Sequence, residues 1–182
     1  TKPFGFMKFY PGPGLGGHCI PVDPHYLSWI LKTLNYTARF VELAAEVNTS
    51  MPDYVVELVA AALNEAKKPV NGSKILLIGI AYKANVSDVR ESPALDVIEL
   101  LKVRGAQVQY HDSFVPSVRL SDGIATSEPL TDELLRGADC VVITAAHEGI
   151  DWRRLTNLAP IIVDTRNATA GVEAPKARVH KL

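Results

Sequence analysis

Apolar and polar positions divide the chain into three parts with different periodicities. Behind Asp23, apolar residues recur at helical spacing, and Asp23-Pro24 is typical of a helix N-cap followed by proline at the first helical position. A second helical pattern covers residues 39–68, which are rich in Ala, Leu, Val and Glu. From residue 74 onward, short apolar runs alternate with helical stretches. This alternation predicts a parallel sheet with helices between its strands.

Residues 39–68 carry apolar side chains on two faces of the predicted helix. These faces are formed by Phe40, Leu43, Ala44 and Val47, and by Val55, Leu58, Val59 and Leu63. Proline inside a helix removes a hydrogen bond and clashes with the preceding turn, so we expect an interruption or kink near Met51-Pro52. Asn48 or Ser50 would then cap a second helix. We expect the two faces to pack against the sheet domain and against a second copy, which predicts a homodimer.

The predicted fold class is α/β, with a central helical segment followed by a doubly wound parallel sheet. The expected strands are residues 74–80, 107–111, 140–144 and 160–164, and the expected helices between them are 94–104 and 132–136. The expected parts are a cysteine loop (1–23), a helical dimerisation segment (24–70) and a sheet domain (71–182).

Ligands of such sheets bind outside the carboxyl ends of the strands. The ligand edge is therefore expected to include residues 80–90, 111–114, 144–147 and 164–167.

Composition narrows the classes of function. The net charge is −1, so no overall field would draw the protein to nucleic acid or to an anionic membrane. No apolar run reaches the length needed to span a bilayer, and no secretory signal opens the chain, so a cytoplasmic protein is expected. The two cysteines, Cys19 and Cys140, do not suggest a disulfide framework. Cys140 lies in an apolar run and is expected to be an inert core residue.

The cysteine loop holds the most reactive residue types. Its Gly12-Pro13-Gly14-Leu15-Gly16-Gly17 run satisfies the G-x-G-x-x-G pattern, but Pro21 and Pro24 block the continuous helix that a dinucleotide fingerprint needs. A rigid loop that presents backbone N–H groups to a ligand fits better.

Three interpretations of Cys19 remain open from the residues alone. It is a small buried cysteine beside a capping aspartate, a metal ligand with His18, Asp23 and His25, or a thiolate nucleophile near a helix N-terminus. The spacing fits no standard zinc pattern, so no metal site is expected.

Three blocks resemble the UDP-glucose/GDP-mannose dehydrogenase family, and they occur in the order that the family has. The blocks are Gly14-Leu15-Gly16-Gly17-His18-Cys19-Ile20-Pro21-Val22-Asp23, Gly79-Ile80-Ala81-Tyr82-Lys83-Ala84-Asn85-Val86-Ser87-Asp88-Val89-Arg90-Glu91-Ser92-Pro93, and Asp164-Thr165-Arg166-Asn167. The resemblance covers nearly the whole chain and implies a Rossmann-like, UDP-sugar-binding sheet domain. It also implies an enzyme that uses NAD to oxidise C6 of a nucleotide-linked sugar to the carboxylate.

The resemblance assigns roles residue by residue. Cys19 matches the nucleophile that forms a thiohemiacetal and then a thioester, and Asp23 matches an aspartate that positions water. The implied substrate contacts are Tyr10, Gly12, Gly14, Gly16, Tyr82, Lys83 and Arg166, the last placed after the final strand. The implied NAD contacts are Cys19, Val22 and Arg90.

The sequence departs from the glucose branch at two positions. His18 and Val22 stand where UDP-glucose enzymes commonly have Ser and Lys, and the variant resembles the branch that oxidises UDP-N-acetylhexosamines. The chain is expected to be the C-terminal part of such an enzyme, inactive without an N-terminal NAD-binding domain. The alternative is a non-catalytic nucleotide-sugar-binding or oligomerisation module.

Three polar residues near the expected ligand edge have no assigned role. Asp112 resembles a ribose-binding carboxylate by position, but the first turn lacks the further glycines of a dinucleotide site, so no NAD role is assigned to it. His111 and His147 have no assigned role.

Overall fold

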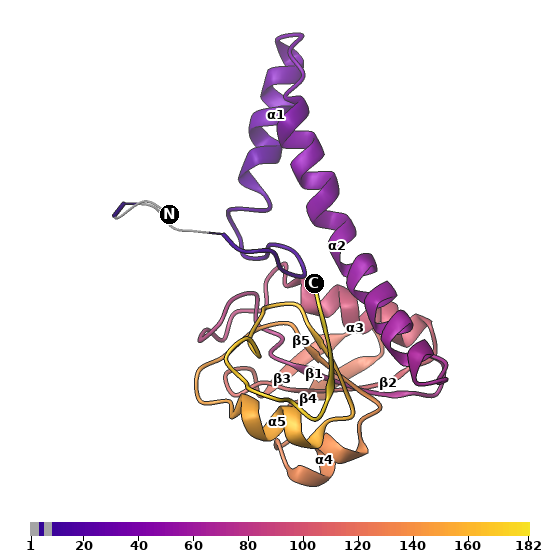
Figure 1. Cartoon of the computed structure of the whole chain (residues 1–182). Coiled ribbons are helices and arrows are strands. Elements are labelled where there is room, and N and C mark those ends of the chain that lie inside the picture. Colours follow the sequence, from indigo (N-terminus) through magenta and orange to yellow (C-terminus); the bar gives the residue numbers. More distant parts are fainter. Residues whose placement is uncertain (1–3, 6–8) are drawn as a thin grey trace.

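The computed structural model describes residues 4–5 and 9–182 and contains a single α/β domain from which a helical arm projects (Figure 1). The arm consists of α1 (Asp23–Thr33) and the first half of α2 (Arg39–Glu65), which run side by side. Phe9 and Tyr10 lie in the part of the cysteine loop that the structure describes, whereas residues 1–3 and 6–8 of that predicted segment lie outside it.

The sheet has five parallel strands in the order β2-β1-β5-β6-β7. Its strands are β1 (Lys74–Ile78), β2 (Gln107–His111), β5 (Cys140–Ile143), β6 (Ile161–Asp164) and β7 (Arg178–Lys181). The chain winds outward from β1 to β2 and then returns to continue from β5 in the other direction, so the sheet is doubly wound as the sequence predicts. Its topological switch point lies between β1 and β5, where ligands of such folds bind.

Helices cover both faces of the sheet. In β1, Ile75 and Leu77 join a cluster with α2 and α3 (Pro93–Val103), while Leu76 and Ile78 join a second cluster on the opposite face. That face is covered by α4 (Asp132–Gly137) and α5 (Trp152–Leu158). Because the central strands are buried on both sides, they form continuous apolar runs rather than alternating ones.

Helix α2 differs from the sequence expectation. It continues without interruption from Arg39 to Glu65, with Pro52 inside it. Neither Asn48 nor Ser50 caps a new helix: the Asn48 side chain binds the cysteine loop, and the Ser50 hydroxyl donates to the carbonyl of Val47. Burial on the domain compensates for the lost backbone hydrogen bond, since Pro52 itself is buried.

Four elements are absent from the prediction. The hairpin β3 (Ser117–Leu120) and β4 (Gly123–Thr126) pairs antiparallel outside the main sheet, and α5 begins behind Asp151, whose side chain accepts from the Arg154 N–H. The strand ending at Asp164 is also not the last, because β7 follows it at the sheet edge. These elements are short, and β3, β4 and β7 are only partly buried, so their apolar patterns are weak.

Candidate active site

Glycines seat the cysteine loop against the segment that follows β1, the β1–α3 loop (residues 79–92). A Cβ atom on Gly16 would lie 2.5 Å from the Glu91 carbonyl oxygen and 2.6 Å from Cβ of Tyr82. Gly17 has φ +95°, faces the Tyr82 ring, and donates its N–H to the Arg90 carbonyl at 2.9 Å. Glycine at these two positions therefore lets the backbone of the cysteine loop approach the β1–α3 loop closely. The Gly17 N–H is bonded within the protein and is not available to a ligand.

Helix α2 holds the same loop from the other side. The Leu15 N–H donates to Oδ1 of Asn48 at 2.6 Å, and Nδ2 of Asn48 donates to the Leu15 carbonyl at 3.4 Å. Gly14 lies beside the backbone carbonyl of Asn48 and against Pro93 at the start of α3. The loop is thus clamped between α2, α3 and the β1–α3 loop.

Cys19 is exposed at the point where the clamped loop enters α1. Its carbonyl accepts the N–H groups of Val22 at 3.0 Å and Asp23 at 2.8 Å, which forms a turn at the helix N-terminus. Asp23 is not the N-cap that the sequence predicts, because it is already in the first turn and no side-chain hydrogen bond caps α1. The carboxylate of Asp23 is therefore exposed on the same helix end as the thiol.

Arg90 is held in an ion pair near the thiol. Its guanidinium binds the Asp88 carboxylate through Nε at 3.0 Å and Nη2 at 2.6 Å. These bonds lower the pKa of Asp88 to about 2. The pKa of Arg90 is raised chiefly by Asp88, with smaller electrostatic contributions from Tyr82 and Cys19. The Arg90 carbonyl is bonded to the N–H of Gly17, two residues before Cys19.

Arg166 lies in the loop after β6 and approaches the cysteine loop. Asp164 fixes this loop, because its buried carboxylate accepts the N–H groups of Arg166, Ala168 and Thr169. The guanidinium lies so close to Gly12 that any Cβ there would collide with it. Desolvation lowers the pKa of Arg166. The side chain keeps substantial solvent access all the same, so it can still meet a ligand.

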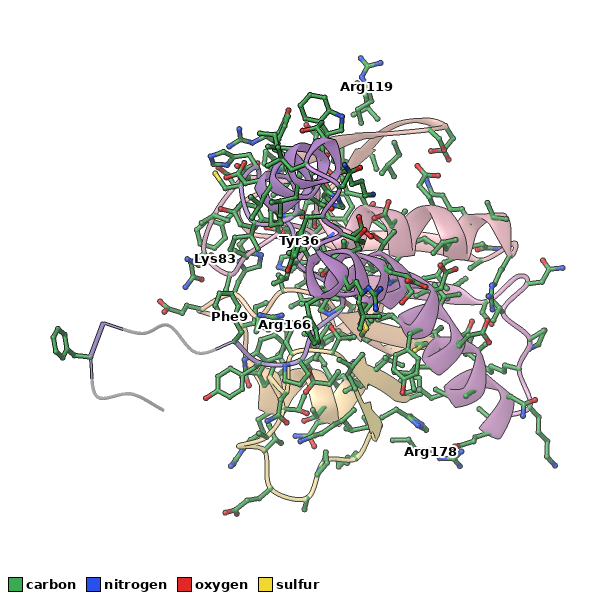
Figure 2. All side chains as sticks on the ribbon, turned by 90° about the horizontal axis from the view of Figure 1, so that it is seen from above. Phe9, Tyr36, Lys83, Arg119, Arg166 and Arg178 are labelled. Carbon is green, nitrogen blue, oxygen red and sulfur yellow. The ribbon has the colours of Figure 1, made fainter. Side chains whose placement is uncertain are left out.

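Lys83 is exposed in the β1–α3 loop. Figure 2 shows its side chain on the same side of the molecule as Phe9, with Arg166 nearer the centre of the view. Tyr10 is also exposed, at 68% of its surface.

The structure brings Gly12, Gly16, Tyr82, Arg90 and Arg166 together around the cysteine loop, as the contacts above describe. Lys83, Tyr10 and Asp23 are exposed. Asn48, Asp88 and Glu91 have no role in the site predicted from the sequence, and their polar groups or carbonyls hold the loop.

Cys140, Asp112 and His111 make contacts within the fold. Cys140 is buried in β5, as predicted, and burial raises its pKa to about 12. Asp112 is buried and accepts backbone N–H groups, so it has no free oxygen for a ribose. His111 binds the Glu128 carbonyl through Nδ1 at 2.7 Å.

Within residues 4–5 and 9–182, no cluster of three or more His, Cys, Asp or Glu side chains could hold a metal ion. No helix in the same residues is long and apolar enough to cross a membrane.

The fold and site define a doubly wound α/β domain whose ligand edge is covered by a clamped loop carrying an exposed cysteine. The chain belongs to the UDP-glucose/GDP-mannose dehydrogenase family: the model of its UDP-binding domain matches residues 76–171, and the model of its central domain matches residues 1–50.

Two relatives illustrate the similarity. A UDP-N-acetyl-D-mannosamine dehydrogenase of Methanococcus maripaludis is 35% identical over 165 residues, covering 86% of this chain and 36% of the relative. An NDP-N-acetyl-D-galactosaminuronic acid dehydrogenase of Ralstonia solanacearum is 34% identical, again covering 86% and 36%. The chain therefore spans about a third of the length of these relatives.

A solved structure has the same arrangement. The UDP-D-ManNAc dehydrogenase of Pyrococcus horikoshii superposes with a TM-score of 0.77 at 26% identity, covering 95% of this chain and 40% of that one.

Proposed function

We propose that the protein containing this chain is an NAD-dependent nucleotide-sugar 6-dehydrogenase that oxidises the C6 alcohol of a UDP-N-acetylhexosamine to the carboxylate. The observation that carries the proposal is the seating of the Cys19 loop. Its backbone is tied to the β1–α3 loop and contacts Arg166, so an exposed thiol and two cation-bearing loops meet at the sheet's ligand edge. Membership of the family and relatives named as UDP-N-acetyl-D-mannosamine dehydrogenases support this substrate class.

The proposed domain roles follow the architecture. Residues 1–23 form the active-site loop, 24–70 the helical dimerisation segment, and 71–182 the UDP-sugar-binding domain. Lys83 and Arg166 lie in loops at the carboxyl ends of β1 and β6, where their charges can meet the pyrophosphate and the uridine-linked groups. The backbone at Tyr10, Gly12, Gly14 and Gly16, together with Tyr82, would enclose the sugar.

Cys19 would act as a covalent catalyst. After the C6 alcohol loses a hydride and a proton, the thiol adds to the resulting aldehyde carbonyl and forms a thiohemiacetal. Loss of a second hydride from that carbon and of the proton on its hydroxyl gives a thioester, and water cleaves the carbon–sulfur bond to release the carboxylate and the thiol. Asp23, exposed on the same helix end, would orient the water. Covalent capture keeps the aldehyde from escaping between the two oxidations.

NAD would accept both hydrides when bound. The residues that fit contact with it are Cys19 and Val22, at the turn that begins α1, and Arg90, in the β1–α3 loop tied to Gly17, which supplies a cation for a pyrophosphate. The Asp88 carboxylate already pairs with Arg90, so NAD binding would involve exchange of that ion pair. The sheet domain has a single glycine, Gly79, in its first turn, so the main cofactor site is proposed to lie in a separate N-terminal domain. The chain by itself is proposed to be inactive.

A homodimer would cover the helical arm. Tyr26, Trp29 and Phe40 are exposed on it, Phe40 at 87%, whereas Val59 and Leu63 of the same α2 are fully buried on the domain. A row of large apolar side chains on an arm projecting from the domain is typical of an interface, and in a homo-oligomer the same patch can serve both copies.

The test is the stoichiometry of oxidation by the full-length protein. With UDP-N-acetylmannosamine or UDP-N-acetylglucosamine, the wild type is expected to reduce two NAD per sugar and release the uronic acid. Cys19→Ser should abolish uronic acid formation, whereas the matched control Cys140→Ala should retain it. A Cys19→Ser protein that still completes the oxidation would contradict the covalent role of Cys19. A wild type that binds the sugar without reducing NAD would favour a binding module.

A further inference from the structure

The buried pair His147 and Asp112 has no part in the chemistry proposed above. Nε2 of His147 lies 3.0 Å from Oδ2 of Asp112, and both side chains are completely buried. A buried imidazole in contact with a carboxylate beside the ligand edge calls for a function.

The carboxylate of Asp112 can only accept hydrogen bonds. Oδ2 accepts the N–H groups of Ile80 at 2.7 Å and Ala81 at 3.1 Å, and Oδ1 accepts those of Phe114 at 2.8 Å and Val115 at 3.1 Å. Burial would raise the pKa of Asp112, but the hydrogen bonds from His147 and from these backbone groups hold it below its ordinary value. The donor in the pair is therefore Nε2–H of His147.

The other ring nitrogen of His147 accepts. The Asn85 backbone N–H donates to Nδ1 at 2.9 Å, which requires a lone pair there and hence a neutral imidazole in its Nε2–H tautomer. Oδ1 of Asn85 in turn accepts the Glu148 N–H at 2.8 Å. Asn85 of the β1–α3 loop therefore both donates to and accepts from the loop after β5. Its backbone has φ +62°.

The β1–α3 loop, which His147 holds through Asn85, also contacts the cysteine loop. Asn85 lies two residues from Lys83, the Tyr82 N–H donates to the Asp88 carbonyl at 3.0 Å, and Gly17 is tied to Arg90. A displacement at Asn85 would therefore move both Lys83 and the Tyr82–Arg90 surface on which Gly16 and Gly17 rest.

We propose that His147 is a positioning residue, which holds the β1–α3 loop through Asn85 so that Lys83 meets the nucleotide sugar and the Cys19 loop stays seated. This role rests on the proposed function for its effect on catalysis. The contacts themselves do not depend on it.

Two substitutions separate the two ends of the imidazole. An asparagine amide reaches roughly where Nδ1 lies and can keep an acceptor for the Asn85 N–H, whereas a glutamine amide reaches roughly where Nε2 lies and can keep the donor to Asp112. His147→Asn should therefore preserve the loop position, and His147→Gln should release it. Asn85→Gly, which tolerates the positive φ but loses the acceptor for Glu148, serves as a second release variant.

The experiment uses the full-length protein and three readouts: the free energy of unfolding, amide hydrogen exchange of residues 82–90, and steady-state kinetics with the UDP-sugar. His147→Gln should speed exchange at the Asn85 amide and raise KM about fivefold, the loss expected for one hydrogen bond, with a smaller change in kcat. His147→Asn should keep the exchange at the Asn85 amide and the KM near their wild-type values, although the free energy of unfolding of this variant also falls.

If His147→Asn and His147→Gln change exchange and KM equally, in step with their loss of stability, the positioning role is wrong and the pair is only part of the core. If the wild type turns over no nucleotide sugar, the proposed function fails. The exchange at Asn85 then decides the positioning role alone, because it is measured without substrate.

Discussion

The backbone N–H of Gly17 donates a hydrogen bond of 2.9 Å to the carbonyl oxygen of Arg90. This bond joins the loop that carries the exposed Cys19 to the loop that carries Lys83, across a large separation in sequence. Since Gly17 has φ +95° and faces the Tyr82 ring, the contact requires glycine there.

Gly16→Ala should damage catalysis far more than stability. Its new Cβ would collide with the Glu91 carbonyl and Tyr82, so the cysteine loop must shift, and a displacement of about 1 Å can cost about a hundredfold in rate. The measurement is kcat/KM of the full-length enzyme. Gly137→Ala is the matched control because no atom lies within 4 Å of its Cβ position. Equal rates in the two variants would show that the loop is not tightly seated.

The two cysteines should differ sharply in alkylation. Cys19 is exposed, whereas burial raises the pKa of Cys140 to about 12, which leaves almost no thiolate there at pH 8. Iodoacetamide at pH 8 should label Cys19 alone in the folded protein and both thiols in denaturant, as read by peptide mass spectrometry. Native labelling of Cys140 would contradict its core position.

Asp112→Asn should destabilise the protein by about 3 kcal/mol at pH 7, because an amide NH₂ would face the N–H donors that the carboxylate now accepts. The pKa of Asp112 is lowered in the folded state, so its contribution is fully present above the unfolded value of about 3.9 and is lost as pH falls through the folded value. The difference between wild type and variant should therefore shrink below about pH 3.9.

Urea unfolding at a series of pH values measures this difference. Asp122→Asn is the control, because that carboxylate is exposed and its ion pair with Lys102 is on the surface. A wild-type advantage that persists unchanged at pH 2 would contradict the assignment of a buried, ionised Asp112.

Phe40→Glu should weaken self-association. The side chain is 87% exposed on the projecting half of α2, and a carboxylate would oppose burial against another copy. Sedimentation velocity of the full-length protein should show a larger monomer fraction. Val103→Glu, which alters an equally exposed apolar residue at the end of α3, should leave the association unchanged. The same shift in both variants would place the interface elsewhere.

The sequence predicted the elements whose patterns are strong and local. Strands β1, β2, β5 and β6 were found within two residues of their bounds, because buried parallel strands form continuous apolar runs. The helix break expected at Pro52 is absent, because local rules cannot weigh the burial of the surrounding residues on the domain. The β3–β4 hairpin has a turn signal in Asp122-Gly123 between alternating residues, although the expected strands do not include it.

The site was predictable only in part. The resemblance proposes Cys19 and Arg90 as site residues, but the sequence predicts neither the Asn48 clamp nor the bond between Asn85 and His147. Asn85 and His147 are 62 positions apart, and only the order of the strands brings them together. The N-cap role expected for Asp23 also failed, because the turn at Cys19 starts the helix one residue earlier.

The most direct test of the central claim is a thermal-shift titration of the full-length protein with UDP, and with GDP in a parallel titration for comparison. UDP at about a hundred times its Kd should add roughly 2.7 kcal/mol of stability, and Lys83→Ala or Arg166→Ala should remove most of that gain. Arg178→Ala should retain it, since that side chain is exposed on β7, well away from Arg166 (Figure 2). No stabilisation by UDP, or the same loss in all three variants, would contradict a nucleotide-sugar site at this edge of the sheet.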